Sequence, residues 1–264
     1  MMVQPEAEQP TVSNAFLTTF YPESRFGGFA DGDSTVAFYV RVHALLKPDS
    51  HVVDFGCGTG SWGQDPVWMR RDLRTLKGKV RKVVGLDVDP AAANNPFIDE
   101  FFLVRDSWNW PLPSRSVDAI VCDSVLEHVE QPDAFFSEAS RVLKLGGWLC
   151  IRTPNVLSYF GILSRLVPTR WRATVLAWAQ PTRRAESVFP ALYRCNTVWR
   201  LRKALSKYGF DAVVWGYEGD PAYLSFWRAA YACGVLHARY APRFCRVELF
   251  AFGRLAEKQA GLFG

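Results

Sequence analysis

The chain alternates between short apolar runs and stretches in which apolar residues recur every three to four positions. Short apolar runs that end in glycine, proline or acidic residues are typical of buried strands. Helical spacing predicts a helix at 34–46, with Ser34 as N-cap, and a second at 132–144, ended by Gly146-Gly147. Further helices are expected at 61–77, broken near Pro66, and at about 197–208. The predicted strands are 51–56, 82–90, 101–105, 117–123, 148–155, 210–216 and 246–254.

This alternation of strands and helices predicts an α/β fold with a mostly parallel sheet and helices on both faces. Two stretches, 156–198 and 217–245, are too long for simple βαβ connections. Both follow late strands, where open sheets build substrate sites. We read them as a cap. The expected organisation is an N-terminal arm or lid at 1–33, loose over its first 20 residues, a core at 34–155, a cap insertion at 156–198, and the rest of the core at 199–264 with a second insertion at 217–245.

Composition narrows the class of protein. At 264 residues the chain can form one sizeable domain. Its six cysteines include no CxxC pair, which argues against a disulfide framework and a zinc site. The polar N-terminus shows no signal peptide, so a reducing cytoplasm is the simplest location.

Charge is divided unevenly along the chain. Residues 1–150 hold 14 Lys/Arg against 20 Asp/Glu, whereas residues 151–264 hold 17 against 6. A basic half suggests an acidic partner such as a phosphate, carboxylate, anionic lipid or nucleic acid; a solvated arginine-rich face explains it equally well.

A glycine-rich loop carries the clearest chemistry. Asp54-Phe-Gly-Cys-Gly-Thr-Gly60 follows a predicted strand and precedes a predicted helix, so its backbone can turn sharply and approach a ligand closely. Dinucleotide enzymes use a similar loop, and the loop alone is therefore weak evidence. The second strand ends at Asp87, where a carboxylate can accept both hydroxyls of a ribose.

From about 51 to 155 the sequence resembles the class I S-adenosylmethionine (SAM)-dependent methyltransferases, in particular the subgroup with small-molecule and ubiquinone-type substrates. VVDFGCGTG, VVGLDVDP, CDSVLEHV and RVLKLGGWLCIRTPN occur in the family's order. The resemblance implies a Rossmann-like sheet of seven strands with the last strand antiparallel. It makes SAM the expected cofactor.

The resemblance also implies which residues surround SAM. The three loop glycines would enclose the methionine portion, Asp54 would hold the loop and the amino group, and Asp87 would bind the ribose. Packing explains Cys57 better than ligand contact does. The implied set is Asp54, Gly56, Cys57, Gly58, Gly60, Asp87, Val88, Asp106, Ser107, Trp108, Asp123 and Ser124.

Methyl transfer needs orientation more than a dedicated catalytic group, because the sulfonium methyl is already activated. For a hydroxyl acceptor the candidate base is His128; the alternative is a wall residue, because LEHV recurs in relatives of differing chemistry. Some ubiquinone-type relatives bind a metal through a Glu, whereas the matching position in this sequence is Ser124. We therefore predict no metal site.

The cap suggests how an acceptor is bound. Cations and aromatic rings alternate there, a mixture that grips phosphates, carboxylates and sugars. Nucleic acid ranks low, because no RNA-binding module is recognised. The apolar stretch 223–236 is too short to span a membrane. We favour the interpretation that it packs on its own domain or on a dimer partner. The alternative is that it contacts a membrane or a lipid-like acceptor. The candidate acceptor residues are Arg152, Asn155, Arg183, Arg184 and Tyr193.

The sequence thus predicts a SAM-dependent methyltransferase that is cytoplasmic or peripheral to the membrane. Its expected acceptor is a hydroxyl group of a small molecule or glycan, with anionic and lipid-linked acceptors among the options. Two alternatives stay open. An NAD(P)-dependent Rossmann oxidoreductase would use GxGxxG, whereas this loop reads GxGxG. A non-catalytic SAM-binding protein would keep the same loop.

Overall fold

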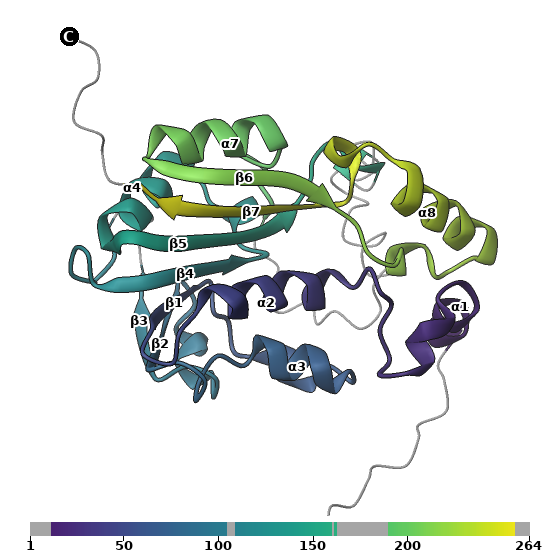
Figure 1. Cartoon of the computed structure of the whole chain (residues 1–264), viewed down its shortest axis with the longest axis horizontal. Helices are drawn as coiled ribbons and strands as arrows, with labels where there is room; N and C mark the ends of the chain where they lie inside the picture. The colour runs from purple at the N-terminus through teal and green to yellow at the C-terminus, as the bar shows by residue number, and fades with distance from the viewer. Residues whose placement is uncertain (1–11, 105–108, 160, 163–189, 257–264) are drawn as a thin grey trace, which may run out of the picture.

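The computed structural model describes residues 12–104, 109–159, 161–162 and 190–256. Seven strands within them form one sheet in the order β3-β2-β1-β4-β5-β7-β6 (Figure 1). The first five run parallel, and β7 is antiparallel to both of its neighbours. The expected fold is therefore confirmed. The strands are β1 (His51–Phe55), β2 (Lys82–Asp87), β3 (Glu100–Leu103), β4 (Val117–Asp123), β5 (Leu143–Pro154), β6 (Phe210–Tyr217) and β7 (Glu248–Leu255).

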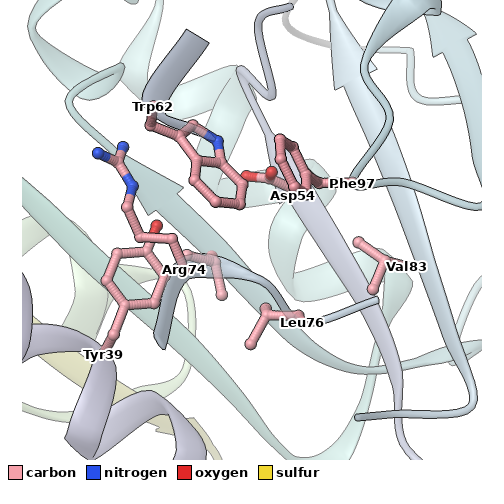
Figure 2. A pocket seen from close by; sticks show the side chains of 8 residues that line it. Tyr39, Asp54, Trp62, Arg74, Leu76, Val83 and Phe97 are labelled. Atoms are coloured by element: carbon pink, nitrogen blue, oxygen red, sulfur yellow. The ribbon is translucent and has the colours of Figure 1, made fainter. Parts of the chain in front are cut away.

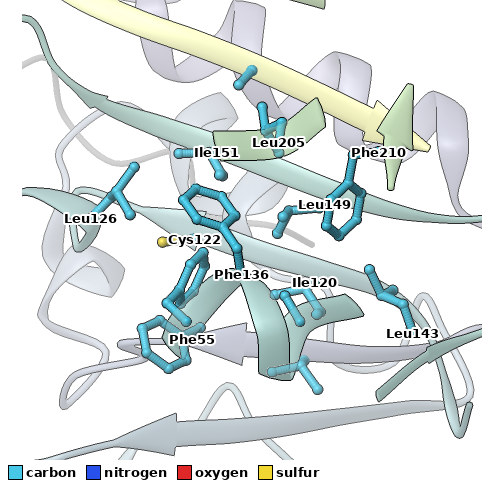
Figure 3. Packing of buried hydrophobic residues seen from close by; sticks show 14 of the residues in the cluster. Phe55, Ile120, Cys122, Leu126, Phe136, Leu143, Leu149, Ile151, Leu205 and Phe210 are labelled. Carbon is cyan, nitrogen blue, oxygen red and sulfur yellow. The ribbon is translucent and has the colours of Figure 1, made fainter. Parts of the chain in front are cut away.

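Helices cover both faces of the sheet because neighbouring strand residues point to opposite sides. In β1, Val53 joins the cluster under α4 and α7, part of which Figure 3 shows, and Val52 joins the cluster under α2 and α3. The helices are α1 (Val12–Phe20), α2 (Ser34–Leu45), α3 (Trp68–Arg74), α4 (Pro132–Val142), α7 (Val198–Lys207) and α8 (Arg228–Tyr240). Short 3-10 helices are η1 (Pro22–Arg25), η2 (Ser61–Gln64), η3 (Pro90–Asn94), η4 (Leu126–His128), η6 (Ala222–Leu224) and η7 (Arg243–Cys245).

Two helix ends differ from the prediction. Asp33, not Ser34, caps α2, because its Oδ1 accepts the Val36 N–H at 2.9 Å. Helix α4 ends at Val142, and Gly146, with φ +78°, lies inside β5 instead of ending the helix. The chain changes directly from helix to strand there, since Leu143 already pairs with β4.

Part of the N-terminal arm is ordered against the second insertion. Residues 12–20, expected to be loose, form α1, which lies beside α8 at one end of the molecule (Figure 1). The rings of Phe16 and Phe20 lie 5.9 and 5.4 Å from the Tyr231 ring, between centroids. The arm and the insertion therefore pack as one unit.

The strand order places a crevice where the chain changes direction. β1 lies between β2 and β4, and the helices that follow β1 and β4 pack on opposite faces. In open α/β sheets the carboxyl ends of such strands form the ligand crevice. The loop after β1 and the residues that end β4 meet there.

Candidate active site

The glycine loop after β1 adopts backbone angles that favour glycine. Gly56, Gly58 and Gly60 have φ values of +73°, +53° and +76°. A Cβ on Gly56 would lie 2.2 Å from Cγ2 of Val125, whereas a Cβ on Gly58 would meet nothing within 4 Å. The loop therefore needs glycine at Gly56 for packing against its own chain, and leaves open space beside Gly58.

Two side chains hold this loop in place. Asp87, at the end of β2, accepts the Gly58 N–H through Oδ2 at 2.8 Å. Asn95 donates from Nδ2 to the carbonyls of Cys57 at 2.9 Å and Gly58 at 3.1 Å. Sequence reasoning missed Asn95, because its only signal, an Asn-Asn-Pro string, is explained equally well by a turn.

A buried ion pair lies at the ends of β4 and β5. Arg152 donates from Nε to Oδ1 of Asp123 at 2.7 Å and from Nη2 to Oδ2 at 2.8 Å, and the two side chains are 6% and 5% exposed. Tyr39 and Arg74 also bond Oδ2 of Asp123, at 3.0 and 3.2 Å. Although burial opposes ionisation, Arg152 and Arg74 lower the pKa of Asp123 well below its usual range. The carboxylate stays ionised and bonded within the protein.

A first pocket opens beside the loop on the α2 face (Figure 2). The rings of Trp62 and Phe97 stack at 4.1 Å between centroids, and the Arg74 guanidinium lies 5.4 Å from the Trp62 ring. Burial, together with the negative charge of Asp123, raises the pKa of Asp54 to about 7. The pocket thus joins a proton-binding carboxyl, a cation and aromatic rings; its lining is Tyr39, Asp54, Trp62, Arg74, Leu76, Val83, Phe97 and Val121.

A second pocket lies farther along the same edge of the sheet, between the start of α2, the end of β6 and the start of β7. It carries three carboxyl groups, and burial is the main cause that raises the pKa of each of them. Oε2 of Glu248 and the hydroxyl of Tyr159 are buried there and have no hydrogen-bond partner among the described residues. Its lining is Ser34, Tyr159, Glu218, Gly219, Asp220, Pro221, Tyr223, Val247 and Glu248.

Hydrogen bonds link the ion pair to both pockets. Tyr39 and Arg74, from the first pocket, bond Asp123. Arg152 in turn donates to the hydroxyl of Ser34, from the second pocket, at 3.3 Å. Asp123 and Arg152 therefore connect the linings of the two pockets through hydrogen bonds.

His128, the expected base, lies in η4 after β4. Its Nδ1 is 3.2 Å from the Pro190 carbonyl oxygen, and its Nε2 is 3.8 Å from Oε1 of Glu127. Glu127 is buried and accepts from the Thr153 hydroxyl at 2.9 Å. His128 is not among the residues that line either pocket.

The other predicted site residues fall in three places. The side chain of Asn155 is buried and donates to the carbonyls of Phe244 and Arg246, both at 2.8 Å, so it holds the chain before β7. Tyr193 donates its N–H to the Glu127 carbonyl at 3.0 Å, with φ +51°. Val88 is 55% exposed beside the loop, Cys57 is buried under it, and Ser124 is exposed. Asp106, Ser107, Trp108, Arg183 and Arg184 lie outside the described residues.

Comparison with known proteins identifies the class. Residues 34–214 match the family model described as a methyltransferase domain, so the chain belongs to that family. A probable S-adenosylmethionine-dependent methyltransferase of Mycolicibacterium smegmatis is 34% identical over 115 residues, 41% of this chain and 39% of the relative. Malonyl-(acyl-carrier protein) O-methyltransferase of Hahella chejuensis is 30% identical over 107 residues, 39% of this chain and 36% of the relative.

The chain therefore spans about two fifths of the length of these relatives. Among solved structures, a SAM-dependent methyltransferase from Archaeoglobus fulgidus superposes with a TM-score of 0.52 at 16% identity, covering 88% of this chain and 97% of the other. That likeness shows the fold. The chain is a class I SAM-dependent methyltransferase domain, and SAM is its cofactor.

Proposed function

We propose that this chain transfers the methyl group of SAM to a hydroxyl group of a small-molecule or glycan acceptor in the cytoplasm. The observation that carries the proposal is the pair of polar pockets on one edge of the sheet, whose linings are joined by hydrogen bonds through Asp123 and Arg152. One pocket adjoins the glycine loop, and the other is available to an acceptor. Methyl transfer needs the acceptor oxygen in line with the sulfonium methyl at about 3–3.5 Å, so the two ligands would extend from their pockets and meet directly beside the ion pair.

The residues beside the loop fit SAM. We propose that Asp54 binds the amino group, Arg74 binds the carboxylate and Asp87 binds the ribose hydroxyls. The open space at Gly58 lets the ligand approach the backbone closely. Bound SAM supplies a methyl group already activated on a sulfonium, so the protein's task is to align the acceptor and exclude water.

The pKa of Asp54 predicts a pH dependence for this binding. An unfolded carboxyl ionises near 4, whereas Asp54 keeps its proton until about pH 7. The ionised form binds the ammonium group, so SAM affinity should increase as pH rises through this window. We expect the dissociation constant to fall about fifteenfold from pH 5.5 to 7.0. Calorimetric titrations at several pH values check this; Asp54→Asn should bind weakly with a flat profile, and an unchanged slope in that variant would remove Asp54 from this role.

The lining of the second pocket supports an uncharged or cationic acceptor. Glu218, Asp220 and Glu248 offer carboxylate oxygens that accept hydrogen bonds from hydroxyl groups, and Tyr159 and Tyr223 offer rings. These acids disfavour the anionic acceptor that the basic half of the chain suggested. The O-methyltransferase of Hahella chejuensis adds support for oxygen as the attacked atom.

Two histidines are candidates for the base that accepts the hydroxyl proton. His128, the candidate from sequence, lines neither pocket. Nδ1 of His237 lies 2.9 Å from Oε2 of Glu218, and its ring packs edge-on against Tyr159 at 4.9 Å between centroids. His237 itself lines neither pocket, but its two contacts, Glu218 and Tyr159, both line the second pocket, so we favour His237, oriented by Glu218, as the base.

Substitution separates the two histidines. His237→Gln should lower the rate of methyl transfer at pH 7 by about 100-fold without weakening SAM binding, because it removes the proton acceptor. His128→Gln should stay within about threefold of the parent. Rates are measured as transfer of labelled methyl from SAM, and binding by calorimetry. The opposite ranking would assign the base to His128.

The proposed function is tested by incubating the chain with methyl-labelled SAM and a fractionated extract of small molecules and glycans. We expect label in a neutral or cationic fraction, as a base-stable methyl ether, and calorimetric binding of SAM but not NADH. SAM binding without transfer to any fraction would favour a non-catalytic SAM-binding protein.

A further inference from the structure

The outward face of α8 is an apolar stripe. Ala229, Cys233, Leu236 and Tyr240 are all exposed, and at 100° per residue they fall within about 60° of one another around the helix. Leu236 is 56% exposed and Tyr240 is 78% exposed. Trp227, just before the helix, is 64% exposed. Apolar residues gathered on one outward face indicate a surface that meets another apolar phase.

The opposite face of α8 is already used for packing. Tyr231, Gly234 and Val235 are buried there. A Cβ on Gly234 would lie 2.4 Å from Pro221, so the helix lies tightly on the residues before it, and Phe16 and Phe20 of α1 cover Tyr231. The orientation of α8 is therefore set by its own domain, and the stripe faces outward.

Within the segment that carries this stripe, the charge is of one sign. Residues 221–247 contain four arginines and no aspartate or glutamate. Arg228 and Arg239 are both exposed in this part of the chain and, eleven residues apart, share one flank of the helix. Arg243, just after the helix, is also exposed. Arginines beside exposed tryptophan and tyrosine form the pattern of a helix that lies in the headgroup region of an anionic bilayer.

Charge also decides between a membrane and a second copy of the chain. An antiparallel two-fold pairing of α8 would bring Arg228 of one copy beside Arg239 of the other, and a parallel pairing would bring each arginine beside itself. No acidic residue within 221–247 is present to offset that repulsion. Anionic lipid headgroups would be attracted by the same arginines.

We propose that the outer face of α8, with Trp227, docks on the surface of an anionic lipid bilayer. No helix in the described part of the chain has the length and apolarity needed to cross a bilayer, so the contact is interfacial. η6 joins the second pocket to α8, since Pro221 and Tyr223 line that pocket. If the second pocket binds the acceptor, as proposed above, docking would place it near the membrane, where a lipid-linked acceptor is presented.

Sedimentation with lipid vesicles tests the docking without needing an acceptor. We expect the full chain to bind vesicles of phosphatidylglycerol and phosphatidylcholine in equal parts, to bind pure phosphatidylcholine at least tenfold more weakly, and to be released by salt. Arg228→Gln/Arg239→Gln should reduce binding to the anionic vesicles about tenfold or more. Trp227→Ser/Leu236→Ser should reduce it similarly by removing inserted apolar groups.

Trp68→Ser is the matched control, because Trp68 is 62% exposed on α3, outside the proposed surface. It should bind vesicles as the parent does, and circular dichroism should show that all the variants are folded. Absence of binding to anionic vesicles, or equal loss in the control, would overturn the proposal. So would a dimer, seen by light scattering, that Trp227→Ser/Leu236→Ser dissociates, since a second copy would then cover the stripe. Loss of methyl transfer with vesicle binding intact would count against the proposed function alone.

Discussion

Replacing Arg152 with methionine should lower the free energy of unfolding by about 3–5 kcal/mol, because it leaves a buried carboxylate without its main partner. Arg152 is 6% exposed and makes two short hydrogen bonds to Asp123 and a third, at 2.9 Å, to the Thr35 hydroxyl. Arg74 and Tyr39 would remain on Asp123, but Arg74 bonds it through a single contact at 3.2 Å. Urea denaturation followed by circular dichroism measures the loss.

A surface ion pair in the same sheet provides the control. Lys82 and Glu100 lie 2.7 Å apart, nitrogen to oxygen, with both side chains 41% exposed. Lys82→Met should cost less than about 1 kcal/mol, because water screens that pair. The double variant Asp123→Leu/Arg152→Met should be more stable than the sum of the two single losses predicts, since no buried charge is left unpaired. Equal losses in Arg152→Met and Lys82→Met would show that the buried pair contributes no more to the free energy of unfolding than a surface pair does.

The positions of Asp123 and Arg152 could be predicted from sequence, but their pairing could not. From the sequence, Asp123 is expected in the SAM site and Arg152 in the acceptor site. In the sheet they are directly opposite each other on β4 and β5. Reading that pairing requires the register of two strands separated by a whole helix, and sequence spacing does not supply a register.

The glycine loop was predictable because its signals are local. A buried strand, alternating glycines and an acid at the end of the next strand lie within 34 residues of one another, from Asp54 to Asp87. The second pocket has no such local signal. Its acids come from the end of β6 and the start of β7, with Tyr217 opposite Glu248, and from Asp220 beyond them.

The net charge of a segment does not give the charge of a pocket within it, for a related reason. The C-terminal half carries an excess of 11 positive charges, yet three of its six acids, Glu218, Asp220 and Glu248, gather in one pocket. A sum over a segment weighs every residue equally, whereas a binding site depends on the few charges that are buried together. The excess of arginine is found in part on the outer surface of α8 instead.

Gly58→Ala should abolish most SAM binding while leaving the protein folded. Gly58 has φ +53°, and a Cβ there would meet no atom of the described residues within 4 Å. The substitution therefore costs about 1 kcal/mol in backbone strain but causes no clash inside the chain. The new methyl group would project into the space we assign to the ligand, and such overpacking typically costs about 1–3 kcal/mol, or about 5- to 150-fold in affinity.

Gly78 offers a matched control for that strain. Its φ is +82°, and a Cβ there would also meet nothing within 4 Å, but it lies between α3 and β2, outside both pockets. Gly78→Ala should lose stability as Gly58→Ala does and keep the affinity of the parent for SAM. Thermal denaturation and calorimetry on the two variants separate strain from obstruction. Equal SAM affinity in both variants would mean that the backbone at Gly58 does not approach the ligand, and the open space there would need another explanation.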